Sequence, residues 1–123
     1  MIRCFLPEDV EKIRELHNSY FWEEFDFPDF LNYLCAFIVE DEKGIILAGG
    51  IRDIAECMAV TDQSRAPKDR AKALYQLMNA SVFTAKQLGY EQLFAWSQNP
   101  KYTRRLLRNG FRLPQGQSLI LDL

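Results

Sequence analysis

The strongest constraint on the fold is a pair of apolar, β-branched runs separated by a short acidic turn. The runs are Cys35–Glu40 and Ile45–Ile51, and the turn between them is Asp41-Glu42-Lys43-Gly44. Two runs of strand length joined by four residues that end in glycine predict a β-hairpin. Neither run approaches the roughly 20 apolar residues that span a bilayer. The centre of the chain is therefore expected to be an antiparallel sheet, with no membrane segment.

Helices and further strands are predicted on both sides of this hairpin. Proline at a helix start and glycine just after a helix end mark the helix boundaries, and apolar residues recur at a spacing of three or four between them. The predicted elements are strand 2–6, a helix from Pro7, a short helix 29–33, the hairpin, strand 56–60, a helix from Pro67 to before Gly89, strand 92–97, helix 100–109, and a final hairpin of 111–113 with 118–123.

The predicted order is β-α-α-β-β-β-α-β-α-β-β, with no internal repeat and no linker. This order, together with a length of 123 residues, predicts a single domain of α/β (α+β) class spanning residues 1–123. A hydrophobic content of 48% and a charged content of 26% exclude disordered and fibrous classes. One core of ordinary size is expected.

The net charge is only −2, but it is divided very unevenly along the chain. Residues 1–63 hold 5 basic and 14 acidic residues, whereas residues 64–123 hold 10 and 3. The total excludes a generally basic nucleic-acid binder, and the run RRLLR is too short to change that. We therefore expect no nucleic-acid partner, and we expect the two halves to face different chemistry.

The three cysteines indicate a reducing compartment. Cys4, Cys35 and Cys57 form an odd set with no CxxC spacing, which speaks against a disulfide framework and against a zinc site. Each has apolar neighbours, so we interpret them as small buried hydrophobic residues. The first residues lack the apolar core of a signal peptide. A cytoplasmic protein without a metal is expected.

Three local motifs, in this order, resemble the GNAT N-acetyltransferase superfamily. FIVEDEKGIILAGGI resembles its second and third strands, MAVTDQSR resembles the end of its fourth strand, and Asn99-Pro100-Lys101-Tyr102 followed by Gly110-Phe111 resembles its late helix. The resemblance covers nearly the whole chain. It implies a GNAT-like acyl-CoA N-acyltransferase fold, in which a central mixed, mostly antiparallel sheet is flanked by helices. Small, glycine-poor versions of this fold resemble those carried by bacteriophages.

The resemblance also implies acetyl-CoA as co-substrate, held between the fourth and fifth strands with its diphosphate at the start of the next helix. Unpaired N–H groups and the helix dipole favour an anion at such a place. Carried over residue by residue, the cofactor-binding set would be Met58, Ala59, Val60, Arg65, Lys68, Arg70, Ala71 and Asn99. Asn99, just before Pro100, is also expected to cap the helix that starts there.

The loop before the long helix departs from the family pattern R/Q-x-x-G-x-G/A. Asp69 and Ala71 stand where the two glycines are expected, and Pro67 has no N–H to donate. Two alternatives remain open. Basic side chains around Lys68 bind the phosphates in place of the backbone, or the helix is capped by Asp69 and its basic first turn is merely solvated.

The catalytic candidates are a carboxylate and a phenol. By resemblance, Glu56 would be the base that deprotonates the amine, because it is the only carboxylate inside the predicted fourth strand; the alternative is a surface-facing glutamate. Tyr102 would be the acid that protonates the leaving thiolate, although the position where the family usually carries tyrosine holds Leu106. A packing or capping tyrosine is the alternative. His17, the only histidine, is interpreted as a packing residue, because it lies on the apolar stripe that the helix from Pro7 is expected to present, formed by Val10, Ile13, His17 and Tyr20.

The most unusual segment is YFWEEFDFPDFLNY at 20–33, with seven aromatic and four acidic residues. By resemblance it flanks the acceptor, and its rings and carboxylates suit a cation such as an amine before it loses its proton. The expected substrate-binding residues are Trp22, Glu23, Glu24, Phe25 and Phe27. The alternative is a protein-binding face with aromatic anchors.

These observations lead to two alternative functions. The first is an acetyl-CoA-dependent N-acetyltransferase that moves an acetyl group to a primary amine, of a small molecule or a protein, by direct attack in a ternary complex. The second is a catalytically inactive GNAT-like protein-interaction or regulatory module. The oligomeric state stays open, with a homodimer as one alternative.

Overall fold

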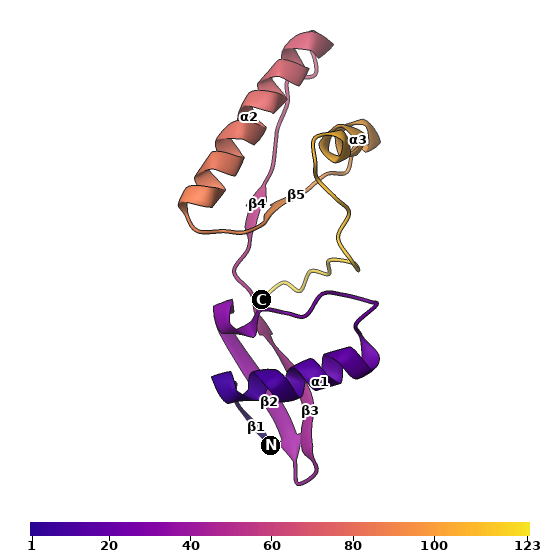
Figure 1. The fold of residues 1–123 in the computed structure, drawn as a ribbon. Helices are drawn as coiled ribbons and strands as arrows, with labels where there is room; N and C mark the ends of the chain where they lie inside the picture. The colour runs from indigo at the N-terminus through magenta and orange to yellow at the C-terminus, as the bar shows by residue number, and fades with distance from the viewer. The chain divides into compact units, whose positions relative to one another are not determined.

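The computed structural model describes residues 1–123, which fall into two compact units (Figure 1). Unit 1 comprises Met1–Asp53 and Leu113–Leu123, and unit 2 comprises Ile54–Arg112. The division of charge follows the units: unit 1 holds 13 acidic and 5 basic residues, and unit 2 holds 4 and 10. The chain is of α+β class, with three α-helices and two sheets. That it forms a single domain stays a prediction.

Unit 1 is built on an antiparallel sheet in the order β1-β2-β3. The predicted central hairpin is confirmed, and Gly44 in its turn has a φ of 124°, a conformation that glycine adopts without strain. A register irregularity lies between Val39 and Glu40. The elements of the unit are β1 (Ile2–Cys4), the 3-10 turn η1 (Pro7–Asp9), α1 (Val10–Tyr20), the 3-10 turn η2 (Phe30–Asn32), β2 (Cys35–Asp41) and β3 (Gly44–Ile51).

The core of unit 1 lies between α1 and one face of the sheet (Figure 1). Ile13 of α1, Phe30 of η2 and Ile38 of β2 are buried together, and the side chain of Ile38 is fully enclosed. The predicted apolar stripe of α1 holds at Ile13 and His17, which lie one turn apart and are both buried. It fails at Tyr20, which is 71% exposed because α1 ends there, beyond the residues that pack on the core.

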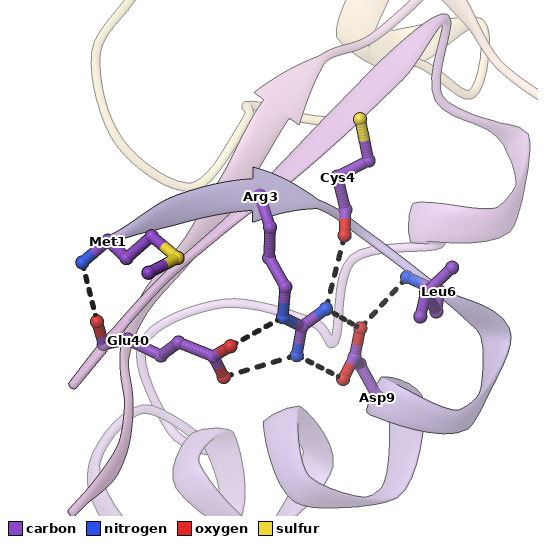
Figure 2. Close-up of polar contacts among 6 residues, drawn as sticks. All are labelled: Met1, Arg3, Cys4, Leu6, Asp9 and Glu40. Carbon is purple, nitrogen blue, oxygen red and sulfur yellow. Dashed lines mark hydrogen bonds and ion pairs between the residues drawn. The ribbon is translucent and has the colours of Figure 1, made fainter. Parts of the chain in front are cut away.

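Arg3 clamps the start of the chain to two carboxylates (Figure 2). Its Nε donates to Glu40 Oε1 at 2.7 Å, and its Nη1 and Nη2 donate to the two oxygens of Asp9 at 2.8 and 2.9 Å. Two further bonds reach Cys4 O and Glu40 Oε2, at 3.1 and 3.2 Å. All five N–H groups of the guanidinium are therefore used inside the protein. The cluster fastens β1 to β2 and to η1, and leaves no donor for a ligand.

The ionisation of the clamp follows from these bonds. The hydrogen bonds from Arg3 lower the pKa of Asp9 to about 2, against the opposing effect of its burial, and the bond from the Leu6 N–H (2.8 Å) acts in the same direction as Arg3. The same guanidinium holds the pKa of Glu40 below its usual range. In return, the two carboxylates raise the pKa of Arg3. All three groups stay charged at neutral pH.

Unit 2 is a β-α-β-α segment. Its strands β4 (Ala55–Cys57) and β5 (Leu93–Ala95) form a parallel pair. The helix α2 (Pro67–Gln87) connects them, and α3 (Pro100–Arg108) follows β5. Both helices begin at proline as predicted, where the missing N–H costs no helical hydrogen bond. Gly89 and Gly110 follow their ends with φ of 86° and 97°.

The bounds of one predicted strand and one whole predicted hairpin are wrong. The strand at 56–60 is shorter: β4 ends at Cys57, because its partner β5 pairs over three residues only. Residues 111–113 and 118–123 form no strand. The N–H of Phe111 donates to Leu106 O at the end of α3, so it is not available for pairing between strands. Pro114 has no N–H to donate to a neighbouring strand.

The expectation that all three cysteines are buried is wrong for Cys4. The cysteines are free, but Cys4 is exposed, because it pairs with Phe37 on the face of the sheet opposite to Ile38. Cys35 and Cys57 are half-buried. No helix of the chain combines the length and apolar character that crossing a membrane requires.

Candidate functional site

The carboxyl ends of β4 and β5 meet at one edge of unit 2. The register aligns Cys57 with Ala95, and the Trp96 N–H donates to Cys57 O at 3.3 Å just beyond the pair. Parallel strands have their carboxyl ends at the same edge of the sheet, and ligands of parallel sheets bind just outside that edge. The predicted cofactor residues Met58, Ala59 and Val60 lie there, after the strand and not within it.

Tyr102 lies near enough to Cys57 at this edge for a charge on one to affect the other. Tyr102 lies in the first turn of α3 and is half-buried; burial raises the pKa of its phenol, and the interaction with the Cys57 thiol raises it further. Burial also raises the pKa of Cys57, with a smaller contribution from the neighbouring Glu56. Both groups therefore carry their protons at neutral pH. A protonated phenol can donate a proton, whereas a protonated thiol is not an activated nucleophile.

Glu56 is exposed and lies on the other side of the strand. Successive side chains of a strand point to opposite faces, so Glu56 points away from the face that carries Cys57. The structure therefore brings Tyr102 together with Cys57 and not with Glu56. The role of Glu56 as base stays a prediction, and its exposure matches the alternative of a surface glutamate equally well.

Sequence reasoning missed Cys57, which it interpreted only as a small buried hydrophobic residue. The neighbouring positions of Glu56 and Cys57 in the predicted strand 56–60 were the signal available, since they place the thiol on the face opposite to the carboxylate. What the sequence did not reveal is that Tyr102 would approach that face.

Asn99 caps α3. Its Oδ1 accepts from the Lys101 N–H at 2.9 Å, which satisfies one of the free donors of the first turn. The hydroxyls of Ser97 and Thr103 lie 2.9 Å apart and fasten the approach of β5 to the helix. The prediction that Asn99 is a helix cap is confirmed, and its contact with a cofactor stays a prediction.

The first turn of α2 is not capped by a side chain. Ala66 occupies the cap position, and Asp69 makes no capping bond, so the alternative of a helix capped by Asp69 is wrong. Arg70 is half-buried: its Nη1 donates to Gln63 Oε1 at 2.8 Å, while its Nε is enclosed and has no partner. Arg65 and Lys68 are exposed beside this turn.

These residues fit an anionic group in part. Free N–H groups of the first turn, the enclosed Nε of Arg70 and the nearby positive charges favour an anion. Pro67 removes one donor, and the carboxylate of Asp69 opposes a negative charge. Ala71, at the place of a family glycine, is half-buried and adds no polar group. A diphosphate here would depend on side chains more than on backbone.

The predicted acceptor residues lie in unit 1, mostly in residues 20–26, which we call the aromatic-acidic turn. Trp22, Glu23, Glu24 and Phe25 are exposed, whereas Phe27, just after the turn, is half-buried. The turn follows α1 directly: the Phe21 N–H donates to His17 O at 2.7 Å, and the Glu24 N–H donates to Phe21 O at 2.9 Å.

His17 holds the far end of this turn. Its side chain is 8% exposed, and its Nε2 lies 2.6 Å from Phe25 O. A carbonyl oxygen only accepts, so Nε2 must carry the hydrogen. The rings of Phe25 and Phe27 meet the imidazole edge-on, at centroid distances of 5.1 and 5.5 Å. The prediction of His17 as a packing residue is confirmed, with the addition of a polar contact that sequence reasoning missed.

Phe27 borders a pocket of about 240 Å³ in unit 1. The guanidinium carbon of Arg14 lies 4.5 Å from the centroid of the Phe27 ring, so a cation already covers that ring. None of the other predicted acceptor residues contributes to this pocket. Its walls are formed by Val10, Arg14, Phe27, Pro28, Asp29, Phe30 and Leu31.

Comparisons with known proteins add no family to this geometry. No family model matches the chain, and neither the curated proteins nor the solved structures yield a match. The chain also contains no group of three or more His, Cys, Asp or Glu side chains arranged to hold a metal ion. The function is therefore argued from the residues themselves.

Proposed function

We propose that this chain is a GNAT-like acetyl-CoA-dependent N-acetyltransferase that moves an acetyl group to a primary amine. The observation that carries the proposal is the position of the half-buried Tyr102, in the first turn of α3 and near Cys57, at the carboxyl ends of two parallel strands. The family resemblance implies a thioester between these two strands. A phenol that keeps its proton at neutral pH is suited to protonate a leaving thiolate.

The order of the elements supports the same proposal. An antiparallel β1-β2-β3 sheet, then β4, a long helix, a parallel β5 and a late helix follow the order that the resemblance implies, up to the missing final hairpin. The uncapped first turn of α2, with Arg70, Lys68 and Arg65 around it, supports binding of the cofactor phosphates. The free cysteines support a cytoplasmic setting.

The residues divide the chemistry as follows. A neutral amine attacks the carbonyl carbon of the thioester, so that a C–N bond forms and the C–S bond breaks. Tyr102 gives its proton to the leaving sulfur, and Glu56, through water, takes the proton that the amine loses. Because Glu56 is exposed and fits a surface glutamate equally well, replacing Tyr102 tests this division of roles more sharply than replacing Glu56 does.

Cofactor binding tests the proposal directly. Calorimetry and thermal unfolding with acetyl-CoA and CoA, up to millimolar concentration, should show heat and stabilisation; absence of both refutes acetyl transfer. If CoA binds, Tyr102→Phe should lower kcat by about 10- to 100-fold with unchanged CoA affinity. Tyr75→Phe is the matched control, since Tyr75 is 57% exposed on α2. Equal rates for both variants would remove Tyr102 from the mechanism.

A second candidate is a GNAT-like module that binds a partner without turnover. The exposure of Tyr20 and Trp22, 71% and 65%, beside acidic residues favours it. The two candidates separate on one pair of measurements. Partner binding without any CoA binding supports the module, and CoA binding with amine-dependent release of free thiol supports the enzyme.

A further inference from the structure

The aromatic-acidic turn exposes large rings that a small protein usually buries. Tyr20 is 71% exposed, Phe21 42%, Trp22 65% and Phe25 37%. Four such side chains lie within six consecutive residues, directly after α1. Exposed apolar groups gathered in this way mark an interaction surface more often than isolated ones do. Trp and Tyr are also the side chains that most often anchor an interface.

The carboxylates of the same turn lack a cationic partner. Glu23, Glu24 and Asp26 are exposed, and the ion pairs of the chain involve other acids, namely Asp9, Glu40 and Glu11. Three negative charges therefore stand within four residues, interleaved with rings. Carboxylates pair with cations, and ring faces attract them. The chemistry of the turn is complementary to lysine and arginine side chains.

The turn is also held in one shape before any partner arrives. Its backbone is fixed at Phe21 through the bond to His17 O, and at Phe25 through the contact with His17 Nε2. The Asp26 N–H adds a bond to Gln115 Oε1 at 3.3 Å. Its rings continue into the core of unit 1. A surface that is already ordered loses little entropy when it binds.

The successive ring contacts can be followed from the surface inward. Each ring in the row contacts the next at a centroid distance of 5.1 to 6.2 Å, and the row reaches the buried Phe30, whose ring also contacts Phe5 and Tyr33. The members in order are Tyr20, Phe21, Phe25, His17, Phe27 and Phe30. Trp22 is not part of the row, and it is 65% exposed.

We propose that the aromatic-acidic turn is a docking surface for a lysine- and arginine-rich segment of a partner protein. Three carboxylates spread over Glu23 to Asp26 call for several cations at peptide spacing, whereas a small amine would satisfy only one of them. The rings between them contact the apolar stems of the same side chains. The inference rests on the second candidate function and deepens it by naming the chemistry of the partner. This binding needs no acetyl-CoA, so it can be tested apart from acetyl transfer.

The fluorescence of Trp22 provides the assay. In a Trp96→Phe background Trp22 is the only tryptophan, and an eight-residue peptide of alternating lysine and arginine is the probe. We expect a saturable change whose dissociation constant rises with salt. Glu23→Gln/Glu24→Gln should weaken binding by about tenfold or more. Glu42→Gln/Glu91→Gln, which removes the same charge from two exposed sites elsewhere, should change it by less than about twofold.

Four results would overturn the inference. These are the absence of a saturable change, equal binding of a peptide with glutamine in place of every lysine and arginine, an equal loss in both double variants, and self-association that the Glu23→Gln/Glu24→Gln variant abolishes in sedimentation. The last result would mean that a second copy covers the turn. Circular dichroism of each variant establishes that it is folded before it is titrated. Acetyl-CoA titration of the same samples keeps the outcome separate from that of the proposed enzyme.

Discussion

Replacing Asp9 by asparagine should weaken unit 1 in a way that depends on pH. The side chain of Asp9 is only 7% exposed and accepts three hydrogen bonds, two from the Arg3 guanidinium and one from the Leu6 N–H. An asparagine side chain at this position would keep the shape but lose the charge, and its amide nitrogen would face a donor. The substitution therefore isolates the electrostatic part of the clamp.

The size of the effect follows from the pKa of Asp9. A fall from 3.8 to about 2 is worth about 2 kcal/mol of folding free energy at neutral pH. Because the Arg3 side chain is 30% exposed, solvent screening reduces the expected loss to about 1–2 kcal/mol. The pKa is lower in the folded protein than in the unfolded chain. The contribution is therefore complete above about pH 4 and is lost as the pH falls toward 2.

Urea unfolding at pH 7, 5, 3 and 2 measures this contribution, followed by far-UV circular dichroism and by Trp22 in the Trp96→Phe background. The wild-type protein and the Asp9→Asn variant should differ by a constant amount at pH 7 and 5, by a smaller amount at pH 3, and by little at pH 2. A difference that stays the same down to pH 2 would refute the electrostatic argument, because it would then arise from packing. Equal stability at pH 7 would refute the clamp altogether.

Two further substitutions test the sheet and the last helix. Gly50→Ala should cost about 1–3 kcal/mol in urea unfolding, because a Cβ there would lie 2.2 Å from Cys35 O. Gly49→Ala is the matched control, with nothing nearer than 4.0 Å, and a similar loss in both would contradict the packing argument. Asn99→Ala should cost about 1 kcal/mol by removing the acceptor of the Lys101 N–H, and Asn99→Asp should restore it. Loss in both Asn99 variants would indicate a role other than capping.

Local signals predicted most of the elements. Pro67 begins α2 and Gly89 follows its end, and both effects depend only on the backbone of the residue itself. Proline fixes its own φ angle, and glycine tolerates a positive φ. The central hairpin follows from its two apolar runs and Gly44 for the same kind of reason. The final hairpin was wrong because apolar strand-like residues need a partner, and the N–H of Phe111 is already used to close α3.

The candidate site was less predictable, because its contacts join residues far apart in the sequence. Nothing local connects Tyr102 with Cys57, and a thiol among apolar neighbours is indistinguishable from a packing residue until the fold is known. The Arg3 clamp could not be predicted from the sequence for the same reason, because Glu40 contacts Arg3 only through the pairing of β1 with β2. Asn99, whose capping bond spans two residues, was predicted from sequence and is confirmed.

The row of rings from Tyr20 to Phe30 has a consequence for how this segment tolerates mutation. A change at the buried end alters the packing of His17 and Phe25, and so alters how the exposed end is presented. Stability and surface recognition therefore share one set of side chains here. We therefore expect few natural substitutions to change stability without changing surface recognition. Pairs of substitutions that compensate for each other should fall on neighbouring rings of the row.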